Sequence, residues 1–170
     1  MDTPRPPQAA ERSRATIREM RPDDLDAVTQ LDARVFGAPR RAYFERRLAA
    51  LASSAQEGHA IGLVAEDGAA IVGFVMGTLS SGEFGFSEGA ALVDSIAVRP
   101  DQRRRGIGQR LASAFVAASV ARGAREIYTL VNWNAWDMLK FFDSMGFSLA
   151  KTVPLRLDVS EEPRTTHEPE

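Results

Sequence analysis

The chain has 170 residues, 44% of them apolar, and its 21 Lys and Arg residues nearly balance 23 Asp and Glu residues. This length can bury one hydrophobic core, and a net charge of −2 gives no overall attraction to nucleic acid or an anionic membrane. With no cysteine and only two histidines, disulfides, thiol nucleophiles and Cys- or paired-His metal sites are excluded. No apolar run is long enough for a membrane span and no signal peptide is evident, so we expect a cytoplasmic protein without a metal.

Both ends of the chain are polar and contain proline. Residues 1–14 and 160–170 lack periodic apolar positions and cannot bury enough surface to offset the entropy lost on ordering. We therefore expect two disordered tails around a single domain at residues 15–159.

The first half of this domain predicts a strand, two helices and a hairpin. Asp23 is expected to cap the first helix, and Asp67-Gly68 is typical of a tight hairpin turn. The elements are expected at residues 16–18 (strand), from Asp23 to Val35 (helix), around Phe44–Leu51 (helix), and at 61–66 and 70–79 (strands).

The second half alternates between strand and helix patterns. A buried strand at 90–98 precedes a helix at 106–122, in which Leu111 and Phe115 should face inward. A strand at 126–131, a helix at 135–145 and strands at 147–149 and 153–159 are expected to follow. Parallel pairing in this half and an antiparallel hairpin in the first predict a mixed α/β sheet with helices on both faces.

One segment carries most of the chemical information, residues 94–110, DSIAVRPDQRRRGIGQR. A buried strand ends, five arginines surround Gly106-Ile107-Gly108, and a helix begins. Glycines let backbone amides approach a ligand, the helix N-terminus adds partial positive charge, and arginines add full charges. This pattern predicts a site for an anion such as pyrophosphate.

Other phosphate loops fit less well. The segment lacks the GxxxxGK[ST] of a P-loop, and Leu111 replaces the third glycine of a dinucleotide fingerprint. An arginine-rich solvated turn remains the plain structural alternative. A nucleic-acid site would need stacking aromatics or a broad basic face, and neither is present in the sequence.

The segment IAVRPDQRRRGIG resembles the signature of the GNAT superfamily of N-acetyltransferases, [RQ]xxGx[GA], matched here by Arg103, Gly106 and Gly108. The later segment NWNAWDMLKFFDSMGF is similar to that family's aromatic helix followed by Gly-Phe. The resemblance implies a mostly antiparallel mixed sheet in which one parallel strand pair splays apart at a bulge. It also implies acetyl-CoA as cosubstrate and a primary amine as acceptor.

The resemblance implies a role for each matching residue. Backbone groups of the strand would pair with the pantetheine arm, and the loop would hold the phosphates, with Asn134 touching the cosubstrate or only capping a helix. The implied cosubstrate-binding residues are Ile96, Ala97, Val98, Arg103, Arg104, Arg105, Gly106, Gly108, Gln109 and Asn134. Arg103 or Arg99 would reach the 3′-phosphate.

The implied reaction is direct attack of the amine on the thioester through a tetrahedral intermediate. An amine is mostly protonated at neutral pH, so a base is needed. Asp94 lies where many family members carry an acid, and its apolar surroundings should raise its pKa. Asp94 could instead be a structural acid that fixes the bulge, and Glu83 is the second candidate base.

Two features depart from the family pattern. Phe142 stands where many relatives have a tyrosine that protonates the leaving thiolate, and Tyr128 is a weaker candidate for that role. An acyl-CoA-binding module with weak catalysis is therefore the alternative function. The acceptor amine is not specified by the sequence, and a homodimer is possible.

Several other motifs have simpler explanations. Residues 85–89 match the GxSxG hydrolase motif, but a strand follows where a helix is required. His59 is expected to be solvated. Trp133, Trp136, Phe141 and Phe142 are expected mainly in the core, with Trp136 or Phe141 as alternatives for flanking pantetheine.

Overall fold

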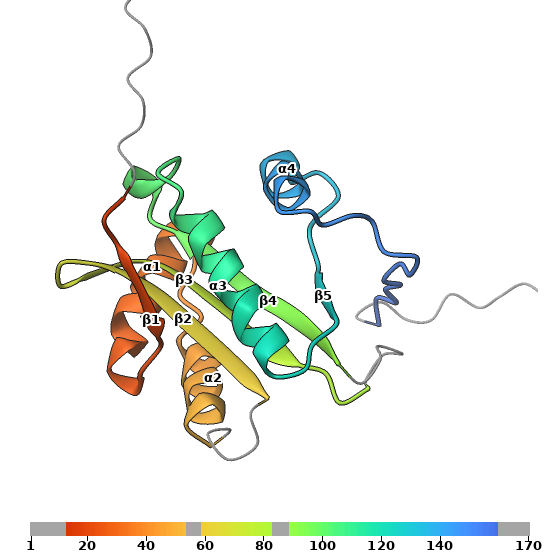
Figure 1. Cartoon of the computed structure of the whole chain (residues 1–170), viewed down its shortest axis with the longest axis horizontal. Helices are drawn as coiled ribbons and strands as arrows, with labels where there is room; N and C mark the ends of the chain where they lie inside the picture. The colour runs from red at the N-terminus through yellow and green to blue at the C-terminus, as the bar shows by residue number, and fades with distance from the viewer. Residues whose placement is uncertain (1–12, 54–58, 83–88, 160–170) are drawn as a thin grey trace, which may run out of the picture.

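A computed structural model describes residues 13–53, 59–82 and 89–159. They form a five-stranded sheet in the order β1-β2-β3-β4-β5, with α1 and α2 on one face and α3 on the other (Figure 1). The first four strands pair antiparallel and β4 pairs with β5 in parallel. The mixed sheet covered on both faces is confirmed.

The elements follow the expected order closely. Their bounds are β1 Thr16–Glu19, η1 Pro22–Asp24, α1 Leu25–Phe36, α2 Arg41–Ser53, β2 Ala60–Asp67, β3 Ala70–Leu79, β4 Ala90–Val98, η3 Pro100–Gln102, α3 Ile107–Ala121, β5 Glu126–Thr129 and α4 Trp136–Ser144.

Two apolar clusters lie on opposite faces of the sheet. Leu111 and Phe115 of α3 are fully buried in one of them, as predicted. Phe44 and Leu48 of α2 pack with Phe74 in the other. Because side chains alternate along a strand, each central strand supplies both clusters and fixes the helices on either side.

A β-bulge interrupts β4 opposite Gly77. Met76 is paired with Ser95 and Gly77 with Val93, so Asp94 has no partner residue on β3. Gly77 allows this close approach, since a Cβ there would lie 2.1 Å from the Leu92 carbonyl oxygen. A bulge bends its strand and redirects side chains.

The parallel pairing of β4 and β5 is short. It runs from Ala90 opposite Glu126 to Val93 opposite Thr129. Beyond that point β4 continues to Val98, and within the described chain no strand pairs with this edge. The two strands diverge toward the end where α4 lies (Figure 1), which confirms the splayed parallel pair.

Three expectations are wrong. Residues 147–149 and 153–159 form no strands, because they find no partner strand: Phe147 packs against Phe142 of α4, and the apolar side chains of 153–159 stay exposed, as Leu155 does at 92%. Trp133 and Trp136 are 81% and 64% exposed and so lie outside the core. The first helical turn is closed by Asp24 rather than Asp23, since the Asp24 carboxylate accepts the Arg21 amide at 2.7 Å.

Candidate functional site

The loop after β4 has the backbone shape of an anion site. Arg104 has a φ of +60°, the only positive value at a non-glycine residue in the described chain, and Gly106 has a φ of +78°. Left-handed residues within a turn direct neighbouring amides toward one side, which forms a concave site for anions. Gly106 is also the N-cap of α3, so the helix dipole adds to the site.

The first amides of α3 are available to a ligand. The Arg110 amide makes the first helical bond, to the Gly106 carbonyl at 3.1 Å. The amides of Gly108 and Gln109 precede that bond, and no described residue provides them with an acceptor. A phosphate is the kind of ligand that such amides bind.

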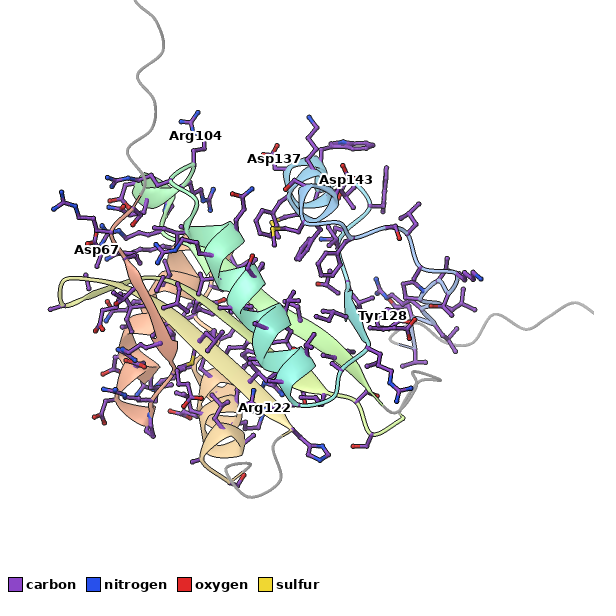
Figure 2. The ribbon with its side chains drawn as sticks, viewed as in Figure 1. Asp67, Arg104, Arg122, Tyr128, Asp137 and Asp143 are labelled. Carbon is purple, nitrogen blue, oxygen red and sulfur yellow. The ribbon has the colours of Figure 1, made fainter. Side chains whose placement is uncertain are left out.

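Three arginines of the loop donate hydrogen bonds to neighbouring residues, and a fourth points outward. Arg99 Nε donates to Asp101 at 2.7 Å, and Arg105 donates to the Gln102 side chain at 2.7 Å. Arg103 Nε donates to the Val98 carbonyl at 3.3 Å. Arg104 points away from the ribbon at this end of α3 (Figure 2).

The hydrogen-bond ladder determines which groups of β4 face the open edge. The Arg99 amide donates to the Val72 carbonyl on β3 at 2.8 Å. Antiparallel ladders alternate, so the backbone groups of Ala97 also face β3, whereas those of Ile96 and Val98 face the open edge. The Val98 carbonyl, reached by Arg103, agrees with this direction.

Gly108 lies close to α4 and to the end of β4. A Cβ on Gly108 would lie 3.4 Å from Phe141 Cε2 and 3.7 Å from Val98 Cγ2. These are ordinary van der Waals distances, so Gly108 lies where the start of α3, the end of β4 and α4 meet, but packing alone does not require a glycine there. This is the end of the molecule at which β4 has its open edge.

Asp94 projects from the bulge toward α2. Its carboxylate forms an ion pair with Arg47, and the two side chains are 28% and 21% exposed. Burial raises the pKa of Asp94 above its usual value, although the Arg47 cation acts in the opposite direction. A desolvated carboxylate beside an open strand edge has the properties of a base.

A second ion pair lies beside the first. Asp32 of α1 is fully buried, and Arg40 binds both of its oxygens, at 2.9 and 2.5 Å. Arg40 also donates to Ser95 Oγ at 3.1 Å, one residue beyond Asp94. Sequence reasoning missed Arg40 and Arg47, although Arg40 directly precedes α2 and Arg47 lies on the helix face of Phe44 and Leu48.

Other predicted site residues stand apart from this group or outside the description. Glu83 lies outside the described residues. Asn134 is exposed in the turn before α4, whose N-cap is Ala135, and no side-chain hydrogen bond caps that helix. Phe142 is buried, and the Tyr128 hydroxyl donates to Glu126 at 3.2 Å.

The described residues contain neither a cluster of metal-binding side chains nor a helix suited to a membrane. They contain no cluster of three or more His, Cys, Asp or Glu side chains that could hold a metal ion. None of the described helices is long and apolar enough to cross a membrane.

The fold and site define an α/β domain with an open strand edge that leads into a glycine-containing loop at the N-terminus of α3. The model of the acetyltransferase (GNAT) family matches residues 25–147. The chain therefore belongs to the GNAT acetyltransferase family. No curated protein matches the sequence.

Solved structures with the same fold have diverse functions. AAC(6′)-Iy bound to the bisubstrate analogue CoA-S-monomethyl-acetylneamine is 21% identical, with a TM-score of 0.70 over 86% of this chain and 99% of that one. Ribosomal-protein-alanine N-acetyltransferase from Brucella melitensis biovar Abortus 2308 is 22% identical, with a TM-score of 0.65 over 85% and 98%. A transcriptional regulator from Bacillus halodurans C-125 is 22% identical, with a TM-score of 0.69 over 85% and 99%.

Proposed function

We propose that this protein is an N-acetyltransferase that moves an acetyl group from acetyl-CoA to a primary amine. The observation that carries the proposal is the continuity of β4. One strand holds the bulged acid Asp94, then an open edge at Ile96 and Val98, and leads into the Gly106 loop.

The described residues suit an acyl-CoA ester. The outward groups of Ile96 and Val98 would pair with the amides of the pantetheine arm, as an added strand does. The backbone groups of Ala97 would hold β4 to β3 on the opposite side of the strand. The pyrophosphate would lie against the first α3 amides and the loop, with Asn134 as a further contact from the turn before α4; the loop residues are Arg103, Arg104, Arg105, Gly106, Gly108 and Gln109.

The chemistry then requires a proton acceptor and a stabilised oxyanion. Asp94 would take the proton of the attacking amine, directly or through water, and its raised pKa suits it to that role. A backbone amide on the β4 edge would donate to the thioester oxygen, whose negative charge increases in the tetrahedral intermediate. Glu83 stays a second candidate base.

An acyl-CoA-binding module with weak catalysis is the second candidate function. The observation that favours it is Phe142, which is 5% exposed and has no proton to give a leaving thiolate. Tyr128 is a poor substitute, because its hydroxyl is directed to Glu126 at the paired end of β5. A CoA thiolate is a fair leaving group, since thiols titrate near about 8.5, so the missing acid slows transfer without preventing it.

The test combines binding with turnover. Acetyl-CoA at about 100 times its Kd should stabilise the protein by roughly 2.7 kcal/mol, and Arg103→Glu should reduce that gain. Arg122→Glu makes the same charge change at the other end of α3 (Figure 2) and should leave binding unchanged. Thiol release with any amine supports a transferase, binding without release supports the module, and no stabilisation of the wild type contradicts both.

Four wider predictions accompany this function. We propose that residues 15–159 form the catalytic domain and that the enzyme acts in the cytoplasm. We also propose that it requires neither nucleic acid nor membrane, and that homodimerisation is compatible with its exposed apolar C-terminal segment. Light scattering on the full chain would test the last point.

A further inference from the structure

The acid proposed as the base is already occupied by a cation. Arg47 reaches Asp94 from α2, so the two form an ion pair before any acceptor arrives. If Asp94 is to accept a proton from the amine, Arg47 must either share the Asp94 carboxylate with the amine or move away from it. The inference below rests on the proposed function, in which Asp94 is the base.

The surroundings of Asp94 carry no uncompensated negative charge within the described residues. Asp32 is neutralised by Arg40, which binds both of its oxygens, and Asp94 by Arg47. A polycationic acceptor needs unpaired carboxylates to replace its lost hydration. The described residues around Asp94 therefore offer no unpaired carboxylate to a polycation.

Arg47 has hydrogen-bonding capacity that the described residues leave unused. Its Nη2 atom pairs with the Asp94 carboxylate, whereas its Nε atom is shielded from solvent and has no hydrogen-bond acceptor in the described chain. A guanidinium has five N–H donors arranged to bind a carboxylate in two-point fashion. A buried donor without an acceptor is costly, so a carboxylate that reaches Nε when the Arg47–Asp94 contact opens would be favourable there.

We propose that Arg47 binds a carboxylate of the acceptor, and that the acceptor is therefore a small α-amino acid or a close derivative. In such a molecule the amine and the carboxylate share one carbon, so the amine can lie at Asp94 while the carboxylate lies at Arg47. The acceptor carboxylate gives Arg47 a new partner and leaves Asp94 free to take the proton. Acceptor binding and activation of the base are then a single event.

The experiment compares acceptors that differ only in this carboxylate. Thiol release is measured with the common α-amino acids, their carboxamides and a polycationic aminoglycoside. A carboxamide's amine is less basic and so more available near neutral pH, and a preference for the acid therefore has to come from the protein. We expect kcat/KM to favour one or more amino acids over the matching carboxamide by at least tenfold.

Variants then assign the preference to Arg47. Arg47→Gln should raise KM for the amino acid at least tenfold and leave KM for the carboxamide within threefold. Arg47→Lys, which keeps the charge but loses the two-point geometry, should recover part of the difference. Arg46→Gln, an exposed neighbour on the same helix without an ion pair in the described chain, should change neither. An unchanged acetyl-CoA affinity shows that each variant is folded.

The outcomes separate this inference from the proposed function. A preference for carboxamides, peptides or the aminoglycoside would overturn the inference and leave the transferase intact. The same KM change for acid and carboxamide in Arg47→Gln would also overturn it. If no amine of any class is acetylated, the proposed function itself fails.

Discussion

Gly77 is expected to be the most sensitive position in the sheet. A Cβ added there would lie 2.1 Å from the Leu92 carbonyl oxygen and 2.5 and 2.6 Å from two ring carbons of Phe115. The first of these atoms is backbone and the ring is fully buried, so neither can move aside easily. Gly77→Ala must push β3 away from β4 at the bulge.

The size of the effect can be compared with a second glycine on the same strand. Overpacking a core costs about 1–3 kcal/mol, and a backbone obstruction places Gly77→Ala at about 3 kcal/mol. At Gly73 the nearest atom to an added Cβ is the Leu111 side chain at 2.9 Å, followed by the Ala97 carbonyl at 3.1 Å. Because that side chain can shift, Gly73→Ala should cost about 1 kcal/mol.

Urea unfolding of the two variants measures the difference in the free energy of unfolding, and thermal unfolding measures the corresponding change in Tm. For a domain of this length, Gly77→Ala should lower Tm by roughly 6–12 °C, at about 2–4 °C per kcal/mol. It should also lower turnover more than the folded fraction explains, because Asp94 sits in the bulge that is displaced. Equal losses for the two variants, or a Gly77→Ala protein as stable as wild type, would refute the geometric argument.

The remaining predictions concern ionisable groups. Asp94→Asn should leave acetyl-CoA affinity within about twofold and lower kcat by roughly 100-fold, and unchanged turnover would exclude Asp94 as the base. Because burial raises the pKa of Asp94, wild-type kcat/KM should rise with pH above the range of an exposed aspartate, and Arg47→Gln should move that rise to higher pH. Burial opposes ionisation of Asp24, but hydrogen bonds from Arg18 and the Arg21 amide hold its pKa below the usual range. Its stabilisation is therefore complete above the unfolded pKa near about 3.9 and lost as pH falls further. Asp24→Asn should lower the free energy of unfolding by roughly 2 kcal/mol at pH 7 and flatten its acid dependence, and parallel urea curves from pH 2 to 7 would contradict this.

Local patterns predicted most of the fold. The hairpin at Asp67-Gly68 and the helix that begins after Gly106 depend on residues next to one another in sequence, and both form as expected. The loop glycines also carry their own backbone preference, which is visible in the positive φ of Gly106. Interactions between residues close in sequence were sufficient to predict these elements.

Partners far apart in sequence were not predictable in the same way. The Arg47–Asp94 pair joins a helix to a strand across 47 positions, and nothing near either residue specifies the other. The strand expected at 153–159 fails for a related reason. Its alternation gives β-propensity, but a strand forms only where a neighbour completes its hydrogen bonds.

The bulge in β4 places two successive polar side chains, Asp94 and Ser95, on one face of the sheet. Val93 and Ile96 pack toward α3, whereas Asp94 and Ser95 both contact arginines on the α1–α2 face. Alternation from Ala91 and Val93 on the α3 side places Asp94 on the α1–α2 face, and the extra residue of the bulge adds Ser95 to that face before Ile96 returns to α3. Asp94 thus has no partner residue on β3, just where β4 loses its pairing with β5. The acid, the bulge and the start of the open strand edge therefore lie at the same point of β4.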